Sequence, residues 1–448
     1  MTVMDNIQLS AFYTLLTLWM LGALVTAQSP PHLCDECQCE PNREAPVTVN
    51  CMCDQKNLLI FQDHYTDAMV NATHLNISSC TFLSLPVAGF GRAPRLHYVE
   101  IKNLKLFHLV PNVFPNLKRL YIDNVKELIL NSFTGLPGFE SLIILRSKMN
   151  ELSTDSFHSI STLKEIILNQ VYIGKILSHG VDADFGDEDL TGEDEGRGTS
   201  FSIQSSKISE IDSNALNIVN LRLFQMINST VETIKDNGLN ISSNTVNIIS
   251  NRFGTLLSNQ SFIFSANYIQ INFNEFHYLP NNILNSIYTP NKVNFLHNII
   301  FDLDLGGFLL NLDFYFVNFK YNKILCNCAP NKVSYLKLNH NFPGIQINNE
   351  TELIVDNFCL SHDQISLYLF KQYLINGTMC SGDVVLNDTL SDGTTETDNL
   401  IEDSSPQMGH NPSQSVISGG SAALERRGPL EVMVALIVLC LSVRCLRY

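Results

Sequence analysis

The stretch FTGLPGFESLIILRS, residues 133–147, carries the pattern that decides the fold. Apolar residues recur at three-residue steps from Phe133 and lead into an apolar-x-apolar phrase at Leu142 and Ile144. The same frame returns at residues 90–101 and 157–168 and, in a shorter form, at 114–122. Self-similarity at a period of about 20–29 residues is typical of a solenoid in which every repeat adds one short strand to a stack.

The apolar-x-apolar phrase recurs along most of the chain and usually leads to Asn, Cys or Ser three residues later. The copies are Leu75-x-Ile77 to Cys80, Val99-x-Ile101 to Leu104, Leu142-x-Ile144 to Ser147, Val246-x-Ile248 to Asn251, Phe262-x-Phe264 to Asn267, Val293-x-Phe295 to Asn298 and Val317-x-Phe319 to Asn322. The two apolar side chains of a phrase point to one face because side chains alternate along a strand. The polar residue at the following turn is expected to satisfy backbone groups that lack a sheet partner. The copies ending at 251, 267 and 298 are unevenly spaced, so the register between 206 and 300 stays open.

With these residues the chain resembles the extracellular leucine-rich-repeat family, in particular arthropod surface-anchored adhesion and signalling members. The resemblance implies an α/β-type leucine-rich-repeat solenoid with a concave parallel β-sheet, an irregular convex side and disulfide-capped ends. The repeats are expected over residues 54–325. Such a solenoid is one elongated body, because it grows by adding units.

Ten cysteines lie between residues 28 and 380 and gather near the two ends of the repeats. The resemblance implies an N-terminal cap over 28–53 and a C-terminal cap over 326–380, and the family pattern would join Cys326 to Cys359 and Cys328 to Cys380. The cysteines of the N-terminal cap are Cys34, Cys37, Cys39 and Cys51. We expect Cys53 and Cys80 to pair because secreted proteins fold in an oxidising compartment. Zinc binding by the four N-terminal cysteines is the less favoured alternative in that compartment.

The N-terminus predicts export. Residues 1–27 read as a signal peptide, with an apolar run and small residues at Val25-Thr26-Ala27, although no Lys or Arg precedes the run; an uncleaved anchor helix is the alternative. Eight N-x-[ST] triplets are candidate glycosylation sites: Asn71, Asn76, Asn228, Asn240, Asn259, Asn349, Asn376 and Asn387. Together with the signal peptide they predict a secreted glycoprotein.

An acidic insertion interrupts the repeats at residues 180–200, and we expect it to be a mobile loop because it has little apolar area to bury. It is either a solvated insertion or a docking loop for a basic partner or for weak calcium binding; the spacing of its carboxylates does not match an EF-hand. Residues 381–431 are rich in Ser, Thr, Asp and Gly and predict a flexible stalk.

The C-terminal tail, residues 432–448, contains an apolar run of about 12 residues, which would span roughly 18 Å as a helix. That is short for a bilayer core of about 30 Å but suits the signal for a glycosylphosphatidylinositol anchor, with attachment expected at Gly420. Arg444 and Arg447 instead favour a short membrane-spanning anchor, and free secretion is the third possibility.

We expect the partner-binding surface on the strands of the concave sheet. In each of these strands the residue between the two buried apolar residues faces outward. These outward residues are Asn76, Glu100, Tyr121, Ile143, Ile167, Ser202, Arg222, Asn247, Ile263, Asn294 and Asn318. Tyr121, Ile143 and Ile167 stand on neighbouring expected strands and predict an apolar partner-binding patch, unless a loop covers them.

The chain has no H-E-x-x-H, G-x-S-x-G or P-loop phrase, so no enzyme activity, cofactor, metal or small-molecule substrate is expected. A net charge of −16 argues against nucleic-acid binding. The sequence therefore predicts a glycoprotein that binds an extracellular or cell-surface protein, in adhesion or developmental signalling, on the outer face of the plasma membrane or secreted. The alternative is a soluble secreted ligand or carrier, or a non-catalytic subunit of a secreted complex.

Overall fold

The structure is a computed structural model. It describes residues 32–302 apart from 54–57, 61–68, 86–89, 91–92, 112, 132, 134–135, 137, 159, 161, 187–197, 281–282, 284–286 and 289–290, and also residues 317–326, 356–360, 365–367 and 369. All of these belong to the first of two compact units, Met1–Asn387. The expected signal peptide, stalk and tail lie outside the described residues.

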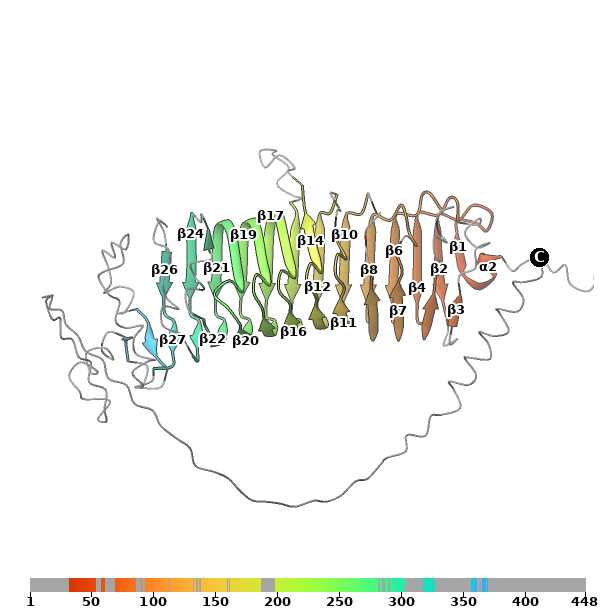
Figure 1. The fold of residues 1–448 in the computed structure, drawn as a ribbon. Coiled ribbons are helices and arrows are strands. Elements are labelled where there is room, and N and C mark those ends of the chain that lie inside the picture. Colours follow the sequence, from red (N-terminus) through yellow and green to blue (C-terminus); the bar gives the residue numbers. More distant parts are fainter. Residues whose placement is uncertain are drawn as a thin grey trace, which may run out of the picture. The chain divides into compact units, whose positions relative to one another are not determined.

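The described strands form two sheets that run side by side, sheet A in the upper half of Figure 1 and sheet B in the lower half. Each turn of the chain passes through one strand of sheet A, a sharp bend and one strand of sheet B. All neighbouring strands pair in parallel except β1, which is antiparallel to β2 and closes the N-terminal end of sheet A. The predicted fold class is confirmed: the chain is a parallel β-solenoid.

Sheet A has fifteen strands in the described part of the chain. They are β1 (Gln38–Glu40), β2 (Thr48–Met52), β4 (His74–Ser78), β6 (Tyr98–Lys102), β8 (Arg119–Asp123), β10 (Ser141–Leu145), β12 (Glu165–Asn169), β14 (Val181–Asp184), β15 (Ser200–Gln204), β17 (Leu216–Ile227), β19 (Leu239–Ile249), β21 (Phe262–Asn272), β23 (Ile287–Tyr288), β24 (Lys292–Leu296) and β26 (Val317–Lys320). One short helix, α2 (Leu33–Glu36), precedes them among the described residues.

Sheet B has thirteen described strands, where an irregular convex side was expected from the sequence. They are β3 (Leu58–Ile60), β5 (Phe82–Ser84), β7 (Leu106–Leu109), β9 (Glu127–Leu130), β11 (Lys148–Leu152), β13 (Tyr172–Ile176), β16 (Lys207–Ile211), β18 (Thr230–Ile234), β20 (Arg252–Leu256), β22 (Glu275–Tyr278), β25 (Ile299–Ile300), β27 (Lys323–Ile324) and β28 (Phe358–Cys359). The second side of the solenoid is therefore a regular sheet. Its strands were not recognised in the sequence because most of them beyond β9 bury residues three positions apart and do not alternate. In β13 the buried residues are Ile173 and Ile176, three positions apart. The pairing of β11 with β13 skips Gly174, where a Cβ atom would collide with the carbonyl oxygen of Asn150.

A left-handed bend joins sheet A to sheet B in almost every turn. The residue at the bend has a φ between 45° and 61° although it is never glycine. These residues are Ser79, Asn103, Asn124, Arg146, Gln170, Ser205, Asn228, Ser250, Phe273, His297 and Tyr321. All except Tyr321 donate their backbone N–H to the end of the next sheet A strand, as Asn103 does to Asp123 at 2.9 Å; Tyr321 donates to the carbonyl oxygen of Asp356. That repeated bond stabilises a backbone conformation that costs roughly 1–2 kcal/mol for a residue with a Cβ atom.

The residue after the bend forms a buried polar ladder in the second half of the solenoid. The Oδ1 atom of Asn274 accepts the backbone N–H of Asn251 at 2.8 Å, and its Nδ2 atom donates to the carbonyl oxygen of Ile248 at 2.9 Å. The same two bonds recur at Asn298 and Asn322. Successive rungs are 22–24 residues apart. The expected role of the polar turn position is therefore confirmed.

Stacked phenylalanine rings fill the core between the sheets. Phe90 stacks on Phe114, and Phe133 stacks on Phe157, with ring centroids 4.7 Å apart in both pairs. These are the residues that start the frame in the sequence, and all four are buried. A second stack joins Phe295 to Phe319 at 5.1 Å toward the C-terminal end.

The open register between 206 and 300 resolves into three long strands, β17, β19 and β21. The core phrase of β21 is Ile269-x-Ile271, leading to Asn274, and Phe262-x-Phe264 belongs to an N-terminal extension of the same strand. Asn267 is therefore exposed and is not a rung of the buried ladder. The uneven spacing in the sequence came from reading this extension as a repeat.

The acidic insertion starts later than expected. Residues 181–184 form β14, which pairs with the extension of β17, and Val181 and Ala183 are buried. Asp182 Oδ1 accepts a hydrogen bond from Asn217 Nδ2 at 2.7 Å. This part of the expected mobile loop is a strand; residues 187–197, which hold the remaining carboxylates, lie outside the described residues.

Four disulfides lie near the two ends of the described solenoid. The first two join Cys34 to Cys39 and Cys37 to Cys51, so the sulfur atoms proposed for zinc are paired with each other. The third joins Cys53 to Cys80 and the fourth Cys326 to Cys359, both pairings expected from the sequence. Cys328 and Cys380 lie outside the described residues.

Candidate functional site

A single row of side chains runs along the outward face of sheet A, between the two buried residues of each strand. We call it the midline row. In-register pairing fixes its members as Asn50, Asn76, Glu100, Tyr121, Ile143, Ile167, Ser202, Gln225, Asn247, Gln270, Asn294 and Asn318. Two expected members were wrong: Gln225 takes the place of Arg222, and Gln270 takes the place of Ile263. Arg222 follows the register shift within β17, and Ile263 lies in the extension of β21.

The midline row changes from polar to apolar and back again. Tyr121, Ile143 and Ile167 are adjacent on β8, β10 and β12, and all three side chains are partly exposed. We call these three residues the apolar patch. Leu145, two positions after Ile143 on the same strand, is also partly exposed and adjoins the patch. Sequence reasoning missed Leu145, although the alternation from Leu142 and Ile144 places it outward.

Polar side chains occupy the rest of the row, and three neighbouring pairs of them bond to each other. Gln225 Nε2 donates to Ser202 Oγ at 2.8 Å, and Asn318 Nδ2 donates to Asn294 Oδ1 at 2.8 Å. At the other end Asn76 Nδ2 donates to Asn50 Oδ1 at 2.7 Å. The apolar patch is therefore the one interruption of the midline row by apolar side chains among the described residues.

Charged pairs border the patch. Lys102 Nζ lies 2.6 Å from Glu100 Oε1 and 5.4 Å from the ring centroid of Tyr121. The hydrogen bond to Glu100 raises the pKa of Lys102. Arg146 binds both carboxylate oxygens of Asp123, at 2.9 and 2.5 Å, and Asp123 is buried. An apolar centre with a polar rim is the usual anatomy of a protein–protein interface.

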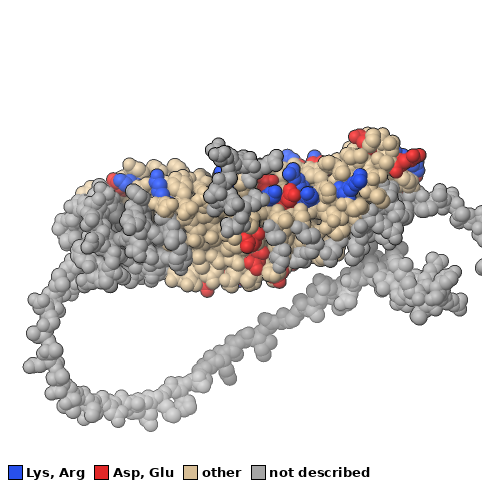
Figure 2. All heavy atoms as spheres, turned by 90° about the horizontal axis from the view of Figure 1, so that it is seen from above, with Lys and Arg blue, Asp and Glu red and all other residues tan. Residues whose placement is uncertain are grey.

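Charges of both signs lie along the solenoid. Figure 2 looks onto the upper edge of Figure 1. It shows small groups of acidic and basic side chains, with uncharged surface between the groups. A broad field of one sign, which would steer a strongly charged ligand, is not visible on this edge among the described residues.

The candidate glycosylation sites fall into two groups. Asn71, Asn228 and Asn259 are exposed. Asn76 and Asn240 lie within strands of sheet A, and the Nδ2 atom of each, which a glycan would occupy, donates to a neighbouring asparagine. Asn349, Asn376 and Asn387 lie outside the described residues, as does the expected lipid attachment site at Gly420.

Comparisons with known proteins give no close relative. No family model and no curated protein matches the chain. Among solved structures, a leucine-rich repeat protein from Bacteroides thetaiotaomicron VPI-5482 is 11% identical with a TM-score of 0.37, over 60% of this chain and 37% of that one. The plant peptide hormone receptor RGFR1, in complex with RGF2, is 12% identical with a TM-score of 0.16, over 64% of this chain and 65% of that one. This chain thus spans less than two thirds of each, and similarity at these TM-scores carries no argument about its function.

The membrane anchor expected from the sequence is not tested by the described residues. No helix among them is long and apolar enough to cross a bilayer.

Proposed function

We propose that this chain is an extracellular leucine-rich-repeat glycoprotein that binds a protein partner through the apolar patch on sheet A. Its role is adhesion or developmental signalling at the outer face of the plasma membrane. The proposal includes a signal peptide over 1–27, cysteine caps at both ends of the repeats, a stalk, and a lipid anchor attached at Gly420.

One observation carries the binding proposal. Tyr121, Ile143 and Ile167 interrupt a midline row that is otherwise polar and in which three neighbouring pairs bond to each other. Apolar side chains at these positions contribute nothing to the core, because the strand directs them away from it. Covering them with a partner removes apolar area from water, which stabilises a complex by roughly 25 cal/mol per Å² before the costs of association.

The disulfides support the proposed extracellular location. The described cysteines all occur in pairs, and disulfides of this kind persist in oxidising compartments.

The test is a matched pair of charge substitutions on the same row. The secreted solenoid, made as tetramers, is applied to cells that display candidate partners. Ile143→Glu should abolish binding, whereas Gln270→Glu, which adds the same charge to a polar part of the midline row, should leave it intact. Equal secretion and equal thermal unfolding of the two variants control for folding. Undiminished binding of the Ile143→Glu variant contradicts the proposal.

A further inference from the structure

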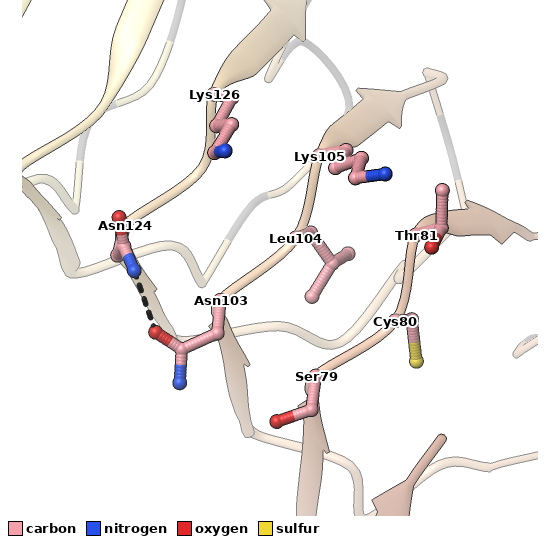
Figure 3. A pocket seen from close by; sticks show the side chains of 8 residues that line it. All are labelled: Ser79, Cys80, Thr81, Asn103, Leu104, Lys105, Asn124 and Lys126. Atoms are coloured by element: carbon pink, nitrogen blue, oxygen red, sulfur yellow. Dashed lines mark hydrogen bonds between the residues drawn. The ribbon is translucent and has the colours of Figure 1, made fainter. Parts of the chain in front are cut away.

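A cavity of about 450 Å³ opens at the bend between the two sheets in the first turns of the solenoid (Figure 3). Its walls come from three successive turns. They are formed by Ser79, Cys80, Thr81, Asn103, Leu104, Lys105, Asn124 and Lys126. The cavity lies on the bend and not on the midline row, so it is separate from the apolar patch.

The cavity coincides with a defect in the buried ladder. From Ser206 onward, the Ser or Asn at each rung accepts the backbone N–H of the preceding rung. Here the rungs after Cys80 are Leu104 and Val125, whose side chains have no polar atom. Within the described residues, neither the N–H of Cys80 nor the N–H of Leu104 donates a hydrogen bond to the protein. Two residues that line this cavity, Cys80 and Leu104, therefore have a backbone N–H without an acceptor among the described residues.

Two lysines of the wall have no counter-charge among the described residues. Lys105 and Lys126 stand on adjacent turns, joined by the bond from the N–H of Glu127 to the carbonyl oxygen of Lys105 at 2.9 Å. Neither lysine forms an ion pair with a described carboxylate, and none of the described residues that line the cavity is acidic. By contrast, Lys175 and Lys235 both bind Glu210, at 3.0 and 2.8 Å. Like charges on neighbouring turns repel each other, and a bound anion removes that cost.

Neutral donors complete the lining. Asn124 Nδ2 donates to Asn103 Oδ1 at 2.7 Å, which leaves the Nδ2 atom of Asn103 as a donor (Figure 3). The hydroxyl groups of Ser79 and Thr81 lie on the neighbouring turn. Ammonium, amide and hydroxyl donors together suit an anionic oxygen group, because hydrogen bonds to charged acceptors are the strong ones.

We propose that this bend cavity binds a sulfate or phosphate group carried on a sugar-sized ligand. The volume falls within the range of about 300–1,000 Å³ that is usual for small-molecule sites, which is larger than a bare ion needs. Lys105 and Lys126 neutralise the oxyanion, and Asn103 with the hydroxyl groups of Ser79 and Thr81 orients it.

The test uses the full chain, purified from eukaryotic cells, and isothermal titration with three probes. These are a sulfated disaccharide, the same disaccharide without sulfate, and inorganic sulfate. The Lys105→Gln/Lys126→Gln variant is compared with Lys118→Gln/Lys207→Gln, which loses the same charge from lysines already paired with Glu140 and Glu232. The first variant should lose affinity for the sulfated disaccharide by about tenfold or more, and the second should keep it.

The outcomes separate the sources of the anion. Binding that requires the sulfate group and fails only in the Lys105→Gln/Lys126→Gln variant supports the proposal. Equal affinity for inorganic sulfate and the sulfated disaccharide overturns the sugar-sized ligand and leaves a bare-ion site. No binding of any probe, or equal losses in both variants, overturns the proposal entirely. None of these outcomes depends on the apolar patch.

Discussion

Asn274 shows how one side chain holds two turns of the solenoid together. Its Oδ1 atom accepts from Asn251 and its Nδ2 atom donates to the carbonyl oxygen of Ile248, and the side chain is fully buried. The amide group of asparagine carries a donor and an acceptor on separate atoms, so one side chain can make both bonds, which accounts for the recurrence of asparagine at this position.

Replacing Asn274 with alanine should lower the free energy of unfolding by about 2–4 kcal/mol, because one buried N–H and one buried carbonyl group lose their partners. The midpoint of urea denaturation measures the loss. Asn169→Ala, at the partly exposed end of β12, is the control and should change stability by less than about 0.5 kcal/mol. Equal effects of the two substitutions would show that the ladder does not stabilise the fold.

Glu210 gives a pH-dependent prediction. Hydrogen bonds from Lys235 and then Lys175 lower the pKa of Glu210 from its ordinary 4.5. A carboxylate with a lowered folded-state pKa stabilises the protein above its unfolded pKa, and that contribution is lost as the pH falls through the folded value. The wild-type urea midpoint should therefore drop more between pH 6 and pH 3 than that of Glu210→Gln.

The Glu210 contribution is below about 1 kcal/mol at pH 6, because the ion pairs reach solvent. Glu127→Gln, an exposed carboxylate on β9, is the matched control and should follow the wild-type pH profile. A Glu210→Gln profile parallel to the wild type rules out the effect.

At the scale of the element, the strands of sheet A were predictable and most of those of sheet B were not. Leu142 and Ile144 alternate with outward residues, which identifies β10 from sequence. Ile173 and Ile176 are three residues apart and flank a glycine, so β13 has no strand-like period. The apolar patch followed from the same alternation, whereas the bend cavity depends on residues from three turns and on missing ladder bonds, which only the three-dimensional structure brings together.

The large side chains at the bend could not be predicted from the sequence for another reason. Phe273, His297 and Tyr321 adopt positive φ, which large residues rarely do. Their rings stack at 4.9 and 5.0 Å on the outside of the solenoid. That contact exists only between successive turns, so a rule based on the preference of one residue for a turn does not predict it.

The disulfide between Cys53 and Cys80 should stabilise the first described turns of the solenoid. It closes a loop with a sequence separation of 27, and removing it with the double Cys53→Ala/Cys80→Ala variant should cost about 3 kcal/mol. Unfolding in urea without reductant measures this loss. Peptide mapping without reduction provides the control, and a free thiol at either position contradicts the pairing.

At the scale of the whole molecule, the solenoid is expected to be tethered by its C-terminal tail. We predict that a phosphatidylinositol-specific phospholipase releases the full chain, tagged just after Gln28, from the cell surface. Deletion of residues 432–448 should send the chain directly into the medium. Retention on cells after treatment indicates a membrane-spanning anchor instead, and tagged full chain in untreated medium indicates a soluble ligand.

The most direct test of partner binding at the apolar patch locates the contact between the partner and sheet A. A photo-reactive phenylalanine analogue is placed at Ile143 in one full chain and at Gln270 in another, and each is displayed on cells and irradiated beside partner-bearing cells. Both positions belong to the midline row, on β10 and β21. We predict a covalent adduct with one partner protein from position 143 and none from position 270. Adducts from position 270 alone, or equal adducts from both positions, would contradict partner binding at the apolar patch.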